Sequence, residues 1–221
     1  MANKIEFENV TVKFNKRWLA LDNVSFTVQK GDFVFLVGPT GAGKTTVLRL
    51  IYGDIMPDQG EVRIDGFPLK KISKARLLEL RTKMGIVFQD LMLLDDRSVF
   101  ENLAFPVRLK GDEDLMRRVV STLKDVGLTH KSNELVKSLS RGEQQRLALA
   151  RAMINEPEIL LADEPFSNLH KTDIDWLIEK MNNYNELGLT VVLSTHNFEV
   201  IPRVPRARVL SIEEGRITLE H

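Results

Sequence analysis

A glycine-rich turn that ends in lysine and threonine is the most specific chemical signal in the sequence. Residues 38–45 match G-x-x-x-x-G-K-[ST] at every fixed position, after a short apolar run and before a helical pattern. Glycine lets successive N–H groups and a helix N-terminus point at one anion, and Lys44 adds a positive charge for terminal phosphates. The turn predicts a nucleotide phosphate site, with a ligand-free turn as the alternative. The predicted binding residues are Gly38, Pro39, Thr40, Gly41, Ala42, Gly43, Lys44, Thr45 and Thr46.

Two adjacent carboxylates, Asp163 and Glu164, follow the apolar run Ile159–Ala162. Such a run predicts a buried strand, and α/β sheets bind ligands at the carboxyl ends of their strands. One acid of a pair placed there can hold the hydration shell of Mg²⁺, while the next reaches the water that attacks a γ-phosphate. Alone, an acidic pair after a strand is more often a helix N-terminal charge. Together with the phosphate turn, it favours ATP and Mg²⁺ as ligands.

The elements that must position these residues follow from the apolar patterning. Three short continuous apolar runs, each followed by charged, helix-like sequence, predict buried parallel strands of a doubly wound α/β core. They are Phe33–Val37, Ile159–Ala162 and Thr190–Ser194. Before them, Ile5–Phe14 and Val24–Val28 predict antiparallel strands, separated by a polar loop around residues 15–17.

The region from Ser98 to Met153 contains helix starts and no strong strand pattern. Ser98 with Glu101, and Ser140 with Glu143, match the capping-box pattern of helix N-termini. We therefore predict one domain over 1–221, with a β subdomain and core over about 1–90 and 157–218 and a helical subdomain over about 91–156. Residues 219–221, Leu-Glu-His, resemble the start of an affinity tag and are expected to have no function.

Composition excludes several classes of protein. The 221 residues carry 31 Lys and Arg against 31 Asp and Glu, so binding of nucleic acid or membrane through bulk positive charge is not expected. With no cysteine, no disulfide or thiolate metal site is possible. The longest uncharged stretches, 33–43 and 187–198, are shorter than the roughly 18–20 residues that a spanning helix needs.

Read in order, the phosphate turn, Gln89, Leu139–Arg146, Ile159–Pro165 and His196 resemble the ATP-binding subunit of ABC-type ATPases. The resemblance covers essentially the whole chain, and it implies a P-loop NTPase core with an N-terminal antiparallel β subdomain and an inserted α-helical subdomain. It also implies ATP hydrolysis by a homodimer that forms on ATP binding, in which each signature stretch completes the partner's site.

The resemblance assigns a role to each matching residue. It implies that Phe14 stacks on adenine, that Lys44 and His196 contact the γ-phosphate, and that Glu164 is the catalytic base. The implied Mg²⁺ ligands are Thr45, Gln89 and Asp163, and the residues that reach the partner's nucleotide are Ser140, Gly142 and Glu143. Each has a plainer explanation: Phe14 as a core residue, Gln89 as the end of a strand at 85–88, His196 as a solvated helix start and Ser140 as a helix cap.

Two positions depart from the family pattern. Arg141 stands at the first glycine of Leu-Ser-Gly-Gly-Gln, where Glu143 also replaces the glutamine. The loop at 167–170 ends in His170, where the family usually has aspartate. These changes put in question the coupling between the two sites of a dimer rather than nucleotide binding, and they leave open a slow assembly scaffold as a function.

Residues 88–102 look most like the FtsE branch of the family, whose cell-division ATPases pair with the membrane protein FtsX and regulate cell-wall hydrolases. The alternative is the ATPase of lipoprotein-release or macrolide-export transporters. Either branch implies an integral membrane partner and a peripheral location on the cytoplasmic face of the bacterial inner (plasma) membrane. Leu91–Leu94, rimmed by charged residues, suit a groove for a short helix of that partner, or else pack against the inserted helices. An ABC ATPase that acts on DNA or ribosomes would need a coiled-coil insertion or tandem cassettes, which the sequence lacks.

Overall fold

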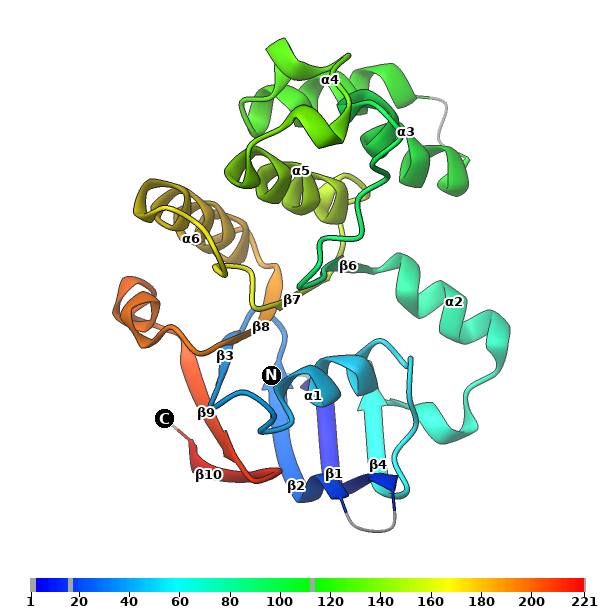
Figure 1. The fold of residues 1–221 in the computed structure, drawn as a ribbon. Helices are drawn as coiled ribbons and strands as arrows, with labels where there is room; N and C mark the ends of the chain where they lie inside the picture. Colours follow the sequence, from blue (N-terminus) through cyan, green and yellow to red (C-terminus); the bar gives the residue numbers. More distant parts are fainter. Residues whose placement is uncertain (1–2, 16–17, 112–113, 221) are drawn as a thin grey trace.

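The computed structural model describes residues 3–15, 18–111 and 114–220, so Lys16, Arg17 and His221 of the segments discussed above lie outside the described residues. These described residues form two sheets and six α-helices. Figure 1 shows how they are arranged along the chain. The strands are β1 (Asn3–Asn15), β2 (Trp18–Gln29), β3 (Phe33–Val37), β4 (Gln59–Ile64), β5 (Phe67–Pro68), β6 (Met84–Val87), β7 (Ile159–Asp163), β8 (Thr190–Thr195), β9 (Arg208–Glu213) and β10 (Arg216–Glu220). The helices are α1 (Lys44–Ile51), α2 (Lys74–Thr82), α3 (Val99–Lys110), α4 (Leu115–Asp125), α5 (Arg141–Met153) and α6 (Lys171–Glu186), with short 3₁₀ helices at η1 (Leu69–Lys71), η2 (Thr129–Lys131), η3 (Val136–Ser138) and η4 (Phe198–Arg203).

The central sheet has the order β10-β9-β3-β8-β7-β6, and all its strand pairs are parallel except β9 with β10. Its middle strand β3 is buried along its whole length because both faces of the sheet are covered. Val34 and Leu36 pack into the core shared with α1 and the N-terminal strands. Phe33, Phe35 and Val37 pack into the core shared with α6 on the other face. This two-sided burial is why the strand reads as a continuous apolar run.

A second, antiparallel sheet has the order β2-β1-β4-β5. The predicted N-terminal antiparallel strands are confirmed, and both are longer than expected. Strand β4, which pairs with β1, was not predicted, nor were β9 and β10 at the edge of the central sheet. The third buried strand, β8, is followed by the 3₁₀ helix η4 and not by an α-helix, because Pro202 lies within that segment.

The inserted helical subdomain is confirmed, and its three main helices α3, α4 and α5 gather on the side of the molecule away from β1, β2 and β4 (Figure 1). Their apolar faces form a separate core that includes Leu103, Leu123 and Leu147. Both predicted capping boxes are present: Ser98 is the N-cap residue of α3 and Ser140 that of α5, each with reciprocal bonds to the glutamate three residues on.

Part of the C-terminal segment that was expected to be a tag belongs to the central sheet. Strand β10 includes Leu219 and Glu220, so these two residues of the predicted tag pair with β9.

Within the described ranges, each helix is too short or too polar to cross a bilayer.

Candidate active site

The phosphate turn lies between β3 and α1, at the carboxyl end of a central strand. Gly43 precedes α1 with a φ of 111°, in the region that favours glycine. A Cβ added there would stand 2.5 Å from the carbonyl oxygen of Ala20, so the strand β2 backbone leaves no room for a side chain. Position 43 therefore requires glycine both for its backbone conformation and because the backbone of β2 lies so close. The turn directs the N-terminus of α1, with its free N–H groups, toward the end of the sheet.

Lys44, the first residue of α1, is only 5 % exposed, and its ammonium is held by the turn itself. Nζ donates to the carbonyl oxygens of Gly38 at 2.7 Å and Pro39 at 3.2 Å. It also lies 3.2 Å from Oε1 of Glu164. The charge of Lys44 is therefore placed inside the turn, next to the acidic pair.

Glu164 and His196 come from neighbouring strands and meet at the same edge of the sheet. Glu164 directly follows β7 and His196 directly follows β8. Nδ1 of His196 lies 2.8 Å from Oε2 of Glu164, whose other oxygen faces Lys44. Glu164 thus bridges a lysine and a histidine that are far from it in the sequence.

Most of the sequence-predicted residues line one cavity of about 250 Å³. Its lining includes the predicted residues Phe14, Thr40, Gly41, Gly43, Lys44, Thr45, Thr46, Gln89, Glu164 and His196, together with Ala20 and Ser167. Phe14 is 53 % exposed, so its interpretation as a core residue is wrong. Gly38, Pro39 and Ala42 belong to the turn and do not appear among the lining residues; Ala42 is buried beneath it. Ala20 lies at this cavity because β2 pairs with β1, which no local pattern indicates.

The three residues implied as Mg²⁺ ligands lie together on an adjoining cavity of about 490 Å³. Thr45, Gln89 and Asp163 contribute a hydroxyl, an amide and a carboxylate, and Thr45 and Gln89 line both cavities. Mg²⁺ binds proteins through a few such oxygen ligands and keeps waters or phosphate oxygens on its other positions. This donor set fits Mg²⁺. Within the described residues, His, Cys, Asp and Glu form no group of three that could hold a metal.

Ser140, Gly142 and Glu143 lie at the N-terminus of α5, and they line neither cavity. Ser140 accepts the N–H of Glu143, and the Glu143 carboxylate accepts the N–H of Ser140 at 2.8 Å. This backbone hydrogen bond from Ser140 lowers the pKa of Glu143 below its ordinary value. A Cβ on Gly142 would stand 2.4 Å from the carboxylate of Asp173 on α6. Helix capping and close packing are therefore sufficient reasons for these residues within one chain.

The two unusual positions occupy the starts of helices. Arg141, the first residue of α5, donates to the carbonyl oxygen of Gln89 at 3.4 Å, so it reaches back across to the segment after β6. His170 is the N-cap residue of α6 and makes no capping bond with its side chain.

Two residues that the sequence analysis did not assign hold the site segments in place. Arg151 of α5 donates to the carbonyl oxygens of Leu91 and Met92 at 2.7 and 2.6 Å, just after Gln89, and burial lowers its pKa. Ser194 of β8 is hydrogen bonded to Asp163. A half-buried arginine and a serine in a mostly apolar strand are weak signals in a sequence, so only their contacts reveal these roles.

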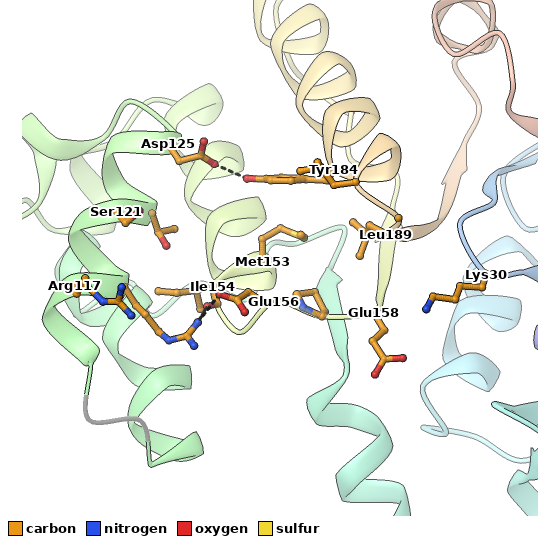
Figure 2. Close-up of a pocket in the computed structure, with 15 residues that line it drawn as sticks. Lys30, Arg117, Ser121, Asp125, Met153, Ile154, Glu156, Glu158, Tyr184 and Leu189 are labelled. Atoms are coloured by element: carbon orange, nitrogen blue, oxygen red, sulfur yellow. Dashed lines mark hydrogen bonds and ion pairs between the residues drawn. The ribbon is translucent and has the colours of Figure 1, made fainter.

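The structure has a third cavity, of about 800 Å³, whose lining residues are drawn in Figure 2. It is bounded by α4 and by the segments that precede β7 and β8, which are the amino ends of the strands. Figure 2 shows Tyr184 of α6 bonded to Asp125 of α4 across one side of it, at 2.6 Å. None of the predicted site residues lines this cavity.

Comparisons with known proteins agree with the geometry. The family model described as ABC transporter matches residues 21–167. The cell division ATP-binding protein FtsE of Streptococcus pneumoniae is 40 % identical over 215 residues, covering 96 % of this chain and 93 % of the relative. FtsE of Escherichia coli is 37 % identical over 215 residues, covering 96 % of each. A solved ATP-binding cassette, described as a dimeric post-hydrolysis state bound to ADP and Pi, matches with a TM-score of 0.88 at 32 % identity, covering 98 % of this chain and 97 % of that chain. The chain therefore belongs to the ABC transporter family, as an ABC-type ATPase.

Proposed function

We propose that this ATPase works as a homodimer that closes on two MgATP and, by opening after hydrolysis, moves an FtsX-like membrane partner. The observation that carries the proposal is the convergence of Lys44, Glu164 and His196 on the cavity that the phosphate turn lines. The relatives named FtsE support the branch, and the cassette solved as a dimer supports the assembly.

Within one chain, the residues of the cavity have different roles in hydrolysis. The turn and Lys44 bind the phosphates, and Phe14 provides an exposed ring for the adenine base. Glu164 takes the proton of the attacking water, and His196 orients the Glu164 carboxylate through its ring nitrogen. Thr45, Gln89 and Asp163 would hold Mg²⁺, and its positive charge would offset the charge that develops on the phosphates.

The dimer supplies what one chain's cavity does not contain. The N-terminus of α5 carries free N–H groups and the positive end of the helix dipole, and Ser140 is exposed there. A transferring phosphoryl group accumulates negative charge, which such donors stabilise. We place the α5 N-terminus of one copy, with Ser140, Gly142 and Glu143, over the nucleotide of the other copy.

We propose that the membrane partner packs against the segment that follows Gln89. Leu91 is buried in the central core and Leu93 is half-buried, whereas Met92 and Leu94 are exposed. The expected apolar patch is therefore reduced to these two side chains, beside the cavity of about 490 Å³. A short helix of an FtsX-like partner packed there would hold the ATPase at the cytoplasmic face of the bacterial inner membrane. Because the patch follows Gln89 directly, a displacement of Gln89 would also displace that helix.

The experiment that tests the proposal replaces Glu164 with Gln, which keeps the side-chain size and removes the base. We expect Glu164→Gln to bind ATP, to accumulate as a dimer in ATP and Mg²⁺, and to lose at least about a hundredfold in turnover. The matched control is Glu179→Gln, an exposed acid on α6. Turnover by phosphate release and dimer formation by light scattering are measured on both. If Glu164→Gln hydrolyses ATP like the control, Glu164 is not the base.

A further inference from the structure

Ser194 lies in β8, one strand away from the acidic pair that ends β7. The two strands are parallel neighbours, and Ser194 is the register partner of Asp163. Its side chain is fully buried, in a strand whose other residues are mostly apolar. A buried hydroxyl in a native structure is normally hydrogen bonded, so its partners indicate what it does.

The hydroxyl of Ser194 is bonded to both members of the acidic pair. Oγ donates to Oδ1 of Asp163 at 2.5 Å and accepts the backbone N–H of Glu164 at 2.9 Å. An N–H can only donate and an ionised carboxylate can only accept, which leaves one direction for each bond. The hydroxyl is therefore an oriented bridge between the side chain of Asp163 and the backbone of Glu164.

The bridge acts at the point where the backbone leaves the strand in an unusual conformation. Glu164 has a φ of 47°, in the left-handed region that a residue with a Cβ occupies at a cost. Its N–H is shared between two oxygens of Ser194, the hydroxyl and the carbonyl oxygen at 3.1 Å. This backbone conformation directs the Glu164 carboxylate toward Lys44 and His196. The interactions of one serine thus hold the backbone that aims the proposed base.

We propose that Ser194 is a positioning residue for hydrolysis, which sets the Glu164 backbone and the Asp163 carboxylate in register with each other. This inference rests on the proposed function, because it takes Glu164 as the base. Ser194 lines neither nucleotide cavity and reaches the site only through Asp163 and Glu164, so we expect its hydroxyl to act mainly on the rate of the chemical step.

The test removes the hydroxyl with Ser194→Ala and uses a matched control on the same strand. Thr190, at the other end of β8, is also fully buried, and its hydroxyl accepts the N–H of Gly31 at 3.0 Å. Thr190→Val therefore removes a buried hydroxyl and leaves one N–H without its partner, far along the strand from Glu164. Melting temperature, affinity for a fluorescent ATP analogue with Mg²⁺, KM and kcat are measured for both variants.

We expect Ser194→Ala to lower kcat by about ten- to a hundredfold, as for a reacting group displaced by a fraction of an ångström, with KM and analogue affinity within about twofold of the wild type. Thr190→Val lowers the melting temperature and leaves kcat within about twofold. Ser194→Thr, which restores a hydroxyl, recovers kcat. The inference is overturned if Ser194→Ala keeps its kcat, if Thr190→Val loses as much, or if a folded Ser194→Thr is as slow as the alanine variant.

Glu164→Gln, assayed in the same series, distinguishes a failure of the role given to Ser194 from a failure of the proposed function. If Glu164→Gln is inactive and Ser194→Ala is not impaired, the role of Ser194 is wrong and the proposed function stands. If Glu164→Gln is active, Glu164 is not the base and the proposed function fails at that step, whatever Ser194→Ala does.

Discussion

Lys44 and Glu164 are in ion-pair contact, with Nζ of the lysine 3.2 Å from Oε1 of the glutamate. Their side chains are only 5 % and 11 % exposed, so solvent screens this attraction weakly. One residue begins α1 and the other follows β7, and the contact joins the phosphate-binding turn to the proposed base. The two groups are electrostatically coupled across the site.

That coupling is measurable as a double-mutant cycle between Lys44→Met and Glu164→Gln in the protein without nucleotide. Each single change leaves a largely buried charge without this partner. The losses of unfolding free energy in the two single variants should therefore add up to more than the loss in the double variant. We expect a coupling free energy of about 1–3 kcal/mol in urea unfolding. Additive effects, within about 0.5 kcal/mol, would show that the contact does not couple the residues.

Phe14→Ala tests the exposed ring at the edge of the nucleotide cavity. Stacking on a base contributes about 1–3 kcal/mol, so we expect ATP affinity to fall about tenfold or more. Because the ring is 53 % exposed, stability changes little. Phe105→Ala is the matched control, since Phe105 is 50 % exposed on α3, away from the cavity. Equal ATP affinities in the two variants, by equilibrium titration, would contradict the adenine contact.

The capping box of α5 predicts a pH dependence of stability. The Ser140 backbone N–H lowers the pKa of Glu143 in the folded state below its ordinary value of 4.5. The ionised form is therefore favoured by folding, and this stabilisation is present above the unfolded pKa and lost as pH falls through the folded pKa. Glu143→Gln keeps an oxygen acceptor and does not titrate.

We expect the wild type to be more stable than Glu143→Gln at about pH 7, with the difference shrinking below about pH 4.5 as the unfolded and then the folded carboxyl is protonated. Urea unfolding of both proteins across this range checks it. Glu101→Gln in the α3 box, where the Ser98 backbone N–H likewise lowers the glutamate pKa, should show the same trend. A difference that does not change with pH would mean that the charge plays no part in the cap.

Local patterns predicted the parts of the molecule whose partners lie a few residues away. The phosphate turn and both capping boxes are contiguous signals, and each was confirmed as a local structure. The apolar runs of β3, β7 and β8 were equally clear, because strands covered on both faces have no polar side. Strand β4 was missed, since an exposed or half-buried strand such as Gln59–Ile64 becomes recognisable only when it pairs with β1.

The sequence by itself determined that this chain has a phosphate turn, an acidic pair and the order of motifs of an ABC-type ATPase. Only the tertiary structure decided which side chains meet: Glu164 between Lys44 and His196, and Ser194 bonded to both acids. The physical reason is that these contacts cross between strands β3, β7 and β8, and the neighbours in a parallel sheet are set by crossover connections that no local pattern records. A buried serine in an apolar strand acquires its partners from the register of that sheet.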